Sequence, residues 1–111
     1  MPSMTIYTNR DRVKSIEKIF SELKEFTAKE LSCGDRKLAS NEISIRVLVP
    51  EASAAIADTE LEILAYSYPE RVKRQDDICC LIKDYIQKYC PHAGSVYVWL
   101  QLSELGHSSK D

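Results

Sequence analysis

Three arginines of this 111-residue chain stand where a guanidinium is costly unless an anion binds it. Arg46 lies in an apolar, β-branched run, SIRVLV, where a charge must be paired. Arg12 and Arg71 begin two predicted helices, where the helix dipole disfavours a cation. Because a guanidinium grips a carboxylate through two hydrogen bonds, all three favour a carboxylate ligand. Two alternatives stay open: Arg46 forms an ion pair across a subunit interface, and Asp11 and Glu70 offset the arginines that follow them.

Arg12 and Arg71 belong to a sequence motif that occurs twice in the chain. Residues 6–19 (IYTNRDRVKSIEKI) align with residues 65–78 (AYSYPERVKRQDDI), so that DRVK lies over ERVK. Apolar residues then recur at helical spacing, at positions 13, 16, 19, 20, 23 and 26 after the first copy and at 78, 82, 85, 86 and 89 after the second. The pattern predicts two amphipathic helices, the first ending near Gly34 and the second stopped by Pro91.

A strand is predicted after each helix, and a short β-prone stretch precedes each copy. Residues 43–49 (ISIRVLV) and 96–102 (VYVWLQL) alternate between two faces. Helices of this length between strands favour right-handed parallel crossovers. We therefore predict an α/β (α+β) fold in which two β-α-β repeats form a four-stranded mixed sheet, with both helices on one face.

The other face of this sheet would be uncovered in a single chain. It would carry Arg46 and Leu48 from one strand and Tyr97 and Trp99 from the other. A large exposed patch of this kind marks an interaction surface. The pattern predicts an oligomer formed through that face.

Length and composition indicate one small domain spanning residues 1–111, with pseudo-repeats at about 2–58 and 59–104 and a polar tail at 105–111. The formal net charge is −2 and no basic run occurs, so neither nucleic acid nor a membrane surface is an expected partner. No stretch is apolar enough for a signal peptide or a membrane span, which predicts a cytoplasmic protein.

Four cysteines, at positions 33, 79, 80 and 90, offer another chemistry. The adjacent pair Cys79–Cys80 points in diverging directions on a helix, and neither His92 nor His107 falls in a zinc-like spacing. We expect no metal site and interpret the cysteines as reduced, buried thiols. A cysteine-based redox protein is a weaker alternative.

The start of the chain, PSMTIYTNRDR, resembles that of 4-oxalocrotonate tautomerase, a member of the tautomerase superfamily in which an N-terminal proline opens the first strand. Arg12 matches an arginine of that start. The segment SIRVLVPE (44–51) is similar to the family's second strand, and Arg46 falls on its substrate-binding arginine. The doubled length looks like that of the members with two β-α-β units per chain, which form trimers.

The resemblance implies a tautomerase that needs no cofactor, with Pro2 as the general base once Met1 is removed. The ordinary pKa of an α-amino group is about 8, and burial lowers it, so a buried amine is a free base near neutral pH. Such an amine can take a proton from carbon α to a carbonyl. The implied substrate is a small 2-oxo acid or a phenylpyruvate-like compound. Tyr68 stands where some dehalogenase and decarboxylase relatives carry another arginine, so the substrate stays open.

The remaining implied site residues are the arginines and two aromatic side chains. Arg46, Arg12 and Arg71 would bind the carboxylate and the carbonyl, and Trp99 and Tyr97 would line an apolar pocket or pack in an interface. The sites would lie near subunit boundaries of a homotrimer. His107 is expected to have no role. The alternative from another class is a non-catalytic oligomeric module of the same fold, with Met1 retained or the chemistry lost.

Overall fold

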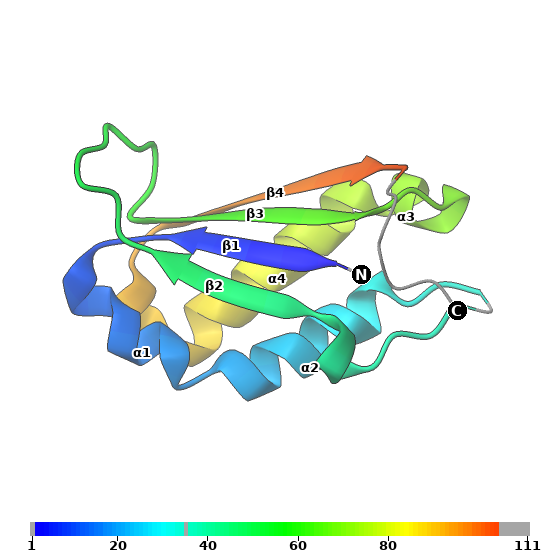
Figure 1. The fold of residues 1–111 in the computed structure, drawn as a ribbon, viewed down its shortest axis with the longest axis horizontal. Coiled ribbons are helices and arrows are strands. Elements are labelled where there is room, and N and C mark those ends of the chain that lie inside the picture. Colours follow the sequence, from blue (N-terminus) through cyan, green and yellow to red (C-terminus); the bar gives the residue numbers. More distant parts are fainter. Residues whose placement is uncertain (1, 35, 105–111) are drawn as a thin grey trace.

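The computed structural model describes residues 2–34 and 36–104. Met1, His107 and the predicted tail 105–111 lie outside the described residues. Two long helices, α2 (Phe20–Leu31) and α4 (Gln75–Tyr89), cover one face of a sheet, as Figure 1 shows. The strands are β1 (Ser3–Tyr7), β2 (Ser44–Leu48), β3 (Thr59–Tyr66) and β4 (Val96–Ser103). No helix in the described part of the chain combines the length and the apolar character that a bilayer crossing requires.

The strand order is β2-β1-β3-β4. β1 pairs with β2 and β3 pairs with β4 in parallel, whereas the central strands β1 and β3 are antiparallel. The two β-α-β repeats are thus joined in one sheet through their first strands. The predicted fold class, a four-stranded mixed sheet with the helices on one face, is confirmed.

Each predicted helix begins with a separate short turn. Arg10–Arg12 forms a 3-10 turn that leads into α1 (Val13–Glu17), and α2 starts only at Phe20. In the second repeat, α3 (Pro69–Lys73) precedes α4, and two further 3-10 turns occupy Ser40–Glu42 and Pro91–Ala93. Pro91 follows the end of α4, as predicted. The first helix ends at Leu31, directly before the segment SCGD near which it was expected to end, but its C-cap is Ser32 rather than Gly34.

The core lies between the sheet and the two long helices. Alternate residues of every strand point into it, because successive side chains of a strand face opposite sides. The buried apolar side chains from the strands and from the two long helices include the following: Met4, Ile6, Leu61, Ile63, Val98, Leu100, Leu23, Leu31, Ile78, Ile82 and Ile86.

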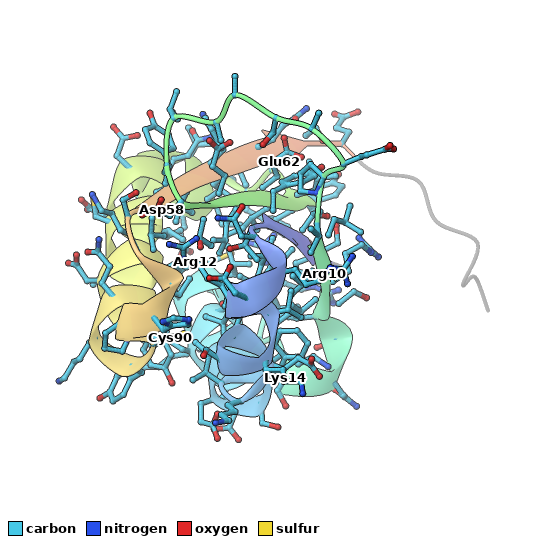
Figure 2. All side chains as sticks on the ribbon, turned by 90° about the vertical axis from the view of Figure 1, so that its left-hand side faces the viewer. Arg10, Arg12, Lys14, Asp58, Glu62 and Cys90 are labelled. Atoms are coloured by element: carbon cyan, nitrogen blue, oxygen red, sulfur yellow. The ribbon has the colours of Figure 1, made fainter. Side chains whose placement is uncertain are left out.

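The opposite face of the sheet is open in the single chain. Its side chains form cross-sheet rows that follow from the strand register. The middle row is Arg46, Thr5, Glu62 and Trp99, and the row toward the carboxyl end of β1 is Leu48, Tyr7, Glu60 and Tyr97. Loop 49–58 rises on this side, away from the helices (Figure 2).

The turn before β4 depends on a glycine that another residue can replace only with strain. Gly94 has φ +74°, and a Cβ there would collide with the Asp58 carboxylate. That carboxylate accepts hydrogen bonds from the backbone N–H (2.9 Å) and the hydroxyl (3.1 Å) of Ser95, so it cannot move freely.

We expect Gly94→Ala to lower the free energy of unfolding by about 2 kcal/mol, through backbone strain and the lost Asp58–Ser95 bonds. Gly34→Ala is the matched control. Gly34 also has a positive φ, +47°, but its added Cβ would meet the movable end of the Glu70 side chain. Chemical denaturation should therefore show the smaller loss for Gly34→Ala, and equal losses would contradict the role given to Asp58.

Candidate active site

Pro2 is buried at the amino end of β1. Its carbonyl accepts a hydrogen bond from the backbone N–H of Ser44 (3.2 Å), which begins the β1–β2 pairing. A proline suits this place because it has no N–H to donate to a neighbouring strand. Ser3 pairs with Leu64, so Pro2 lies at the end of the sheet where β3 finishes.

Arg71 is also buried, with 3% of its surface exposed. Its Nε donates to the Leu31 carbonyl and its Nη1 to the Tyr66 carbonyl, both at 2.8 Å. The Tyr68 ring packs against the guanidinium, and its centroid lies 4.9 Å from Cζ of Arg71. Nη2 is buried without a hydrogen-bond partner among the residues that the structure describes. Burial lowers the pKa of Arg71, because a desolvated cation is disfavoured.

Pro2 and Arg71 belong to the same end of the sheet. Leu64 lies opposite Ser3, and Tyr66, whose carbonyl holds Arg71, follows two residues later in β3. Figure 1 shows the chain's amino end and α3 at this one end. The fold therefore places a buried proline and a buried guanidinium, one donor of which has no acceptor in the described part of the chain, at one end of the two central strands.

Arg74, which the sequence analysis did not single out, supports this end. Its Nη1 donates to the Glu30 carbonyl (3.1 Å), and its Nη2 forms an ion pair with Glu30 Oε1 (2.8 Å). Arg71 and Arg74 thus both contact the last residues of α2, where cations favour the helix dipole. The spacing of three residues within ERVKR was the available sequence signal.

Arg12 lies at the other end of β1. The five residues of β1 span about 17 Å at about 3.3 Å per residue, so Arg12 cannot reach Pro2 of its own chain. Its Nε donates to the His92 carbonyl (3.1 Å), and its Nη2 lies 3.9 Å from Asp58 Oδ1 (Figure 2).

The arginine of each copy of the repeated motif therefore donates a hydrogen bond to a backbone carbonyl of the other repeat. Arg71 of the second repeat holds the last residue of α2, and Arg12 of the first repeat holds His92, just beyond α4. The acid that pairs with Arg12 is Asp58 rather than the expected Asp11, and Glu70, expected to offset Arg71, accepts a hydrogen bond from the Gly34 N–H (3.1 Å).

The other predicted site residues, Arg46, Trp99 and Tyr97, lie on the open face of the sheet, as expected. The strand pairing places none of them opposite Pro2. Arg46, on the edge strand β2, pairs with Thr5 of β1, and its Nη1 lies 3.4 Å from the Thr5 hydroxyl. Trp99 and Tyr97 are 39% and 45% exposed, with ring centroids 4.4 Å apart. They belong to β4, two strands away from β1, so the single chain does not bring them to Pro2.

An acidic hollow of about 460 Å³ lies beneath loop 49–58, and sequence reasoning missed it. Asp58, Glu60 and Glu62 line it together with Tyr7. Glu60 Oε2 accepts hydrogen bonds from the N–H groups of Ile56 (2.8 Å) and Ala57 (3.3 Å), which fastens the loop. The alternating acids of DTELE were the available signal. Three carboxylates make this hollow a poor place for a carboxylate ligand.

The fold of this chain, two β-α-β repeats that share one mixed sheet with both helices on one face, is the fold of solved macrophage migration inhibitory factor and 4-OT structures. No protein-family model matches the sequence, and no curated protein matches it. The support comes from solved structures.

A macrophage migration inhibitory factor-like protein from Entamoeba histolytica is similar over 96% of this chain and 95% of its own, with 12% identity and a TM-score of 0.60. A fused 4-OT that forms a symmetric trimer is similar over 98% and 93%, with 11% identity and a TM-score of 0.57. Macrophage migration inhibitory factor from Giardia lamblia is similar over 90% and 97%, with 14% identity and a TM-score of 0.54. At these identities the likeness concerns the fold alone.

The cysteines are all free, but they are not all buried. Cys90 is buried, Cys33 and Cys79 are half-buried, and Cys80 is exposed, which corrects the expectation of four buried thiols. Burial raises the pKa of the Cys79 and Cys90 thiols, so little reactive thiolate forms there at neutral pH.

Labelling of the native protein with a thiol reagent should therefore modify Cys80 first. We expect Cys90 to react at least about tenfold more slowly, since its thiol is buried away from the reagent and burial also raises its pKa. Peptide mass spectrometry over a time course measures both rates. Fast modification of Cys90 in the folded protein would show that its site opens readily.

Proposed function

We propose that this protein is a tautomerase that moves a proton between carbon and oxygen of a small 2-oxo acid or a phenylpyruvate-like compound. Pro2, with Met1 removed, is the general base, and Arg71 binds the substrate's carboxylate or carbonyl oxygen. The observation that carries the proposal is the buried Nη2 of Arg71, which has no partner in the described structure, at the same end of the sheet as buried Pro2.

The chemistry follows from these two groups. A free proline nitrogen in an apolar site loses stabilisation of its protonated form, so it is available as a base near neutral pH. It takes a proton from the carbon next to the carbonyl, the electrons form the enol or enolate, and the proton returns to another atom of the substrate. A guanidinium beside the carbonyl oxygen stabilises the negative charge that develops there.

We further propose a homotrimer with its sites near the subunit boundaries. The apolar open face supports an assembly, and a fused 4-OT of the same fold forms a symmetric trimer. In that arrangement Arg12, Trp99 and Tyr97 reach the site from a neighbouring subunit. Two roles compete for Arg46: carboxylate binding from the neighbour, or an ion pair across the interface.

A second candidate is a non-catalytic oligomeric module with the same fold. It is favoured by the bracing roles of the repeated arginines, because Arg12 and two nitrogens of Arg71 hold backbone carbonyls. If these are their only roles, the arginines of the repeated motif serve to stabilise the fold and not to bind a substrate.

Two measurements separate the candidates. The first is the intact mass of protein from its native host, which shows whether Met1 is removed. The second is a spectrophotometric assay with phenylenolpyruvate and 2-hydroxymuconate. Loss of one methionine together with turnover supports the tautomerase, whereas a retained methionine, or no turnover of either compound, supports the module.

A further inference from the structure

The middle row of the open face holds one cation and one acid. Arg46 and Glu62 flank Thr5, so their Cα atoms are two strand spacings, about 10 Å, apart. The ion pairs among the described side chains are Arg12–Asp58 and Arg74–Glu30, and neither includes Arg46 or Glu62. Their contacts are long: 3.4 Å from Arg46 to the Thr5 hydroxyl and 3.4 Å from the Tyr7 hydroxyl to Glu62.

Apolar side chains surround these two charges. The large apolar residues exposed on this face are Leu48, Leu64, Tyr66, Tyr97 and Trp99. Whatever covers such a patch also removes water from Arg46 and Glu62, and a desolvated charge is costly without a partner. A fitting partner must therefore bring an acid to Arg46, a cation to Glu62 and apolar surface between them.

We propose that a second copy of this chain covers the face, with Arg46 of one copy paired with Glu62 of the next. Another copy carries both required charges in one row, whereas a uniformly acidic or basic partner would satisfy only one of them. In a closed ring of copies, each Arg46 pairs with the Glu62 of the next copy, so every one of these charges has one partner. Glu60 is the less suitable acid, because two backbone N–H groups of loop 49–58 already occupy it.

This inference rests on the proposed trimer but not on its catalytic activity. It makes Arg46 an interface residue rather than a substrate-binding one. The number of subunits and the rate of turnover therefore respond to different substitutions.

The test is a charge exchange followed by sedimentation. Arg46→Glu and Glu62→Arg each place like charges opposite one another, and each should raise the dissociation constant of the oligomer at least about thirtyfold. The double variant Arg46→Glu/Glu62→Arg should restore assembly. Lys14→Glu, a charge reversal on the exposed helix side (Figure 2), is the control and should leave assembly unchanged.

Restoration in the double variant also shows that the single variants did not merely misfold. A monomeric wild-type protein, or a double variant no better assembled than the single ones, would overturn the pairing. So would an intact Arg46→Glu oligomer with a raised KM, which would make Arg46 a ligand-binding residue. An oligomer that behaves as expected but turns over no substrate would leave the pairing intact and remove the proposed activity.

Discussion

Pro2→Ala should lower kcat about 100-fold in the phenylenolpyruvate assay. Alanine keeps an α-amino group, but it loses the ring that fixes the direction of the nitrogen, and a small misplacement of a catalytic group costs a rate factor of this order. The fold should survive, since the carbonyl of residue 2 still accepts the Ser44 N–H.

A neighbouring substitution is the control for this prediction. Ser3→Ala changes the next residue, whose side chain lies on the open face, and should turn over substrate at the wild-type rate. Equal kcat values for wild type and Pro2→Ala would show that the proline nitrogen is not the base. The tautomerase proposal would then fail, while the fold would stand.

Arg71→Met should have two separable effects. The free energy of unfolding should fall by about 3 kcal/mol, because the carbonyls of Leu31 and Tyr66 lose charged donors, partly offset by removal of a desolvated cation. KM should rise about 10- to 100-fold, as the loss of one charged hydrogen bond to a substrate carboxylate predicts. Denaturation and steady-state kinetics measure the two effects independently.

Two further variants guard this prediction. Arg74→Met removes a comparable brace on α2, but the Arg74 side chain is 42% exposed, so the expected stability loss is smaller, about 1 kcal/mol. Arg71→Lys keeps the charge and should fold if Arg71→Met does not, yet it lacks the fork that serves two carbonyls and a ligand together. An unchanged KM in a folded Arg71 variant would reduce this residue to a brace.

Much of the fold could be predicted because its signals are local. The alternation in residues 43–49 and 96–102 places Arg46, Tyr97 and Trp99 on the face away from the helices, and the structure confirms it. The side-chain period of a strand or helix is set by backbone geometry within a few residues. The repeated motif likewise indicated two β-α-β units, but it did not indicate how the two units pair in the sheet.

The candidate site could be predicted only in part. The sequence pointed to Pro2 and the arginines but grouped all of them around one nitrogen. In the single chain Pro2 and Arg71 lie at the same end of the sheet, and Arg12 lies at the far end of β1. Glu62 and Arg74 escaped notice because an acid in a strand and a third arginine in a helix are ordinary until their neighbours are known.

What the sequence determined by itself is the set of elements, the face on which each side chain lies and the residue types available for proton transfer and carboxylate binding. What only the tertiary structure decided is the direction in which the two repeats meet. Antiparallel pairing of β1 and β3 sends the two copies of the arginine motif to opposite ends of the sheet. Each arginine then bonds a carbonyl 40 or 80 residues away, a choice that depends on the free energy of packing both repeats together rather than on any local pattern.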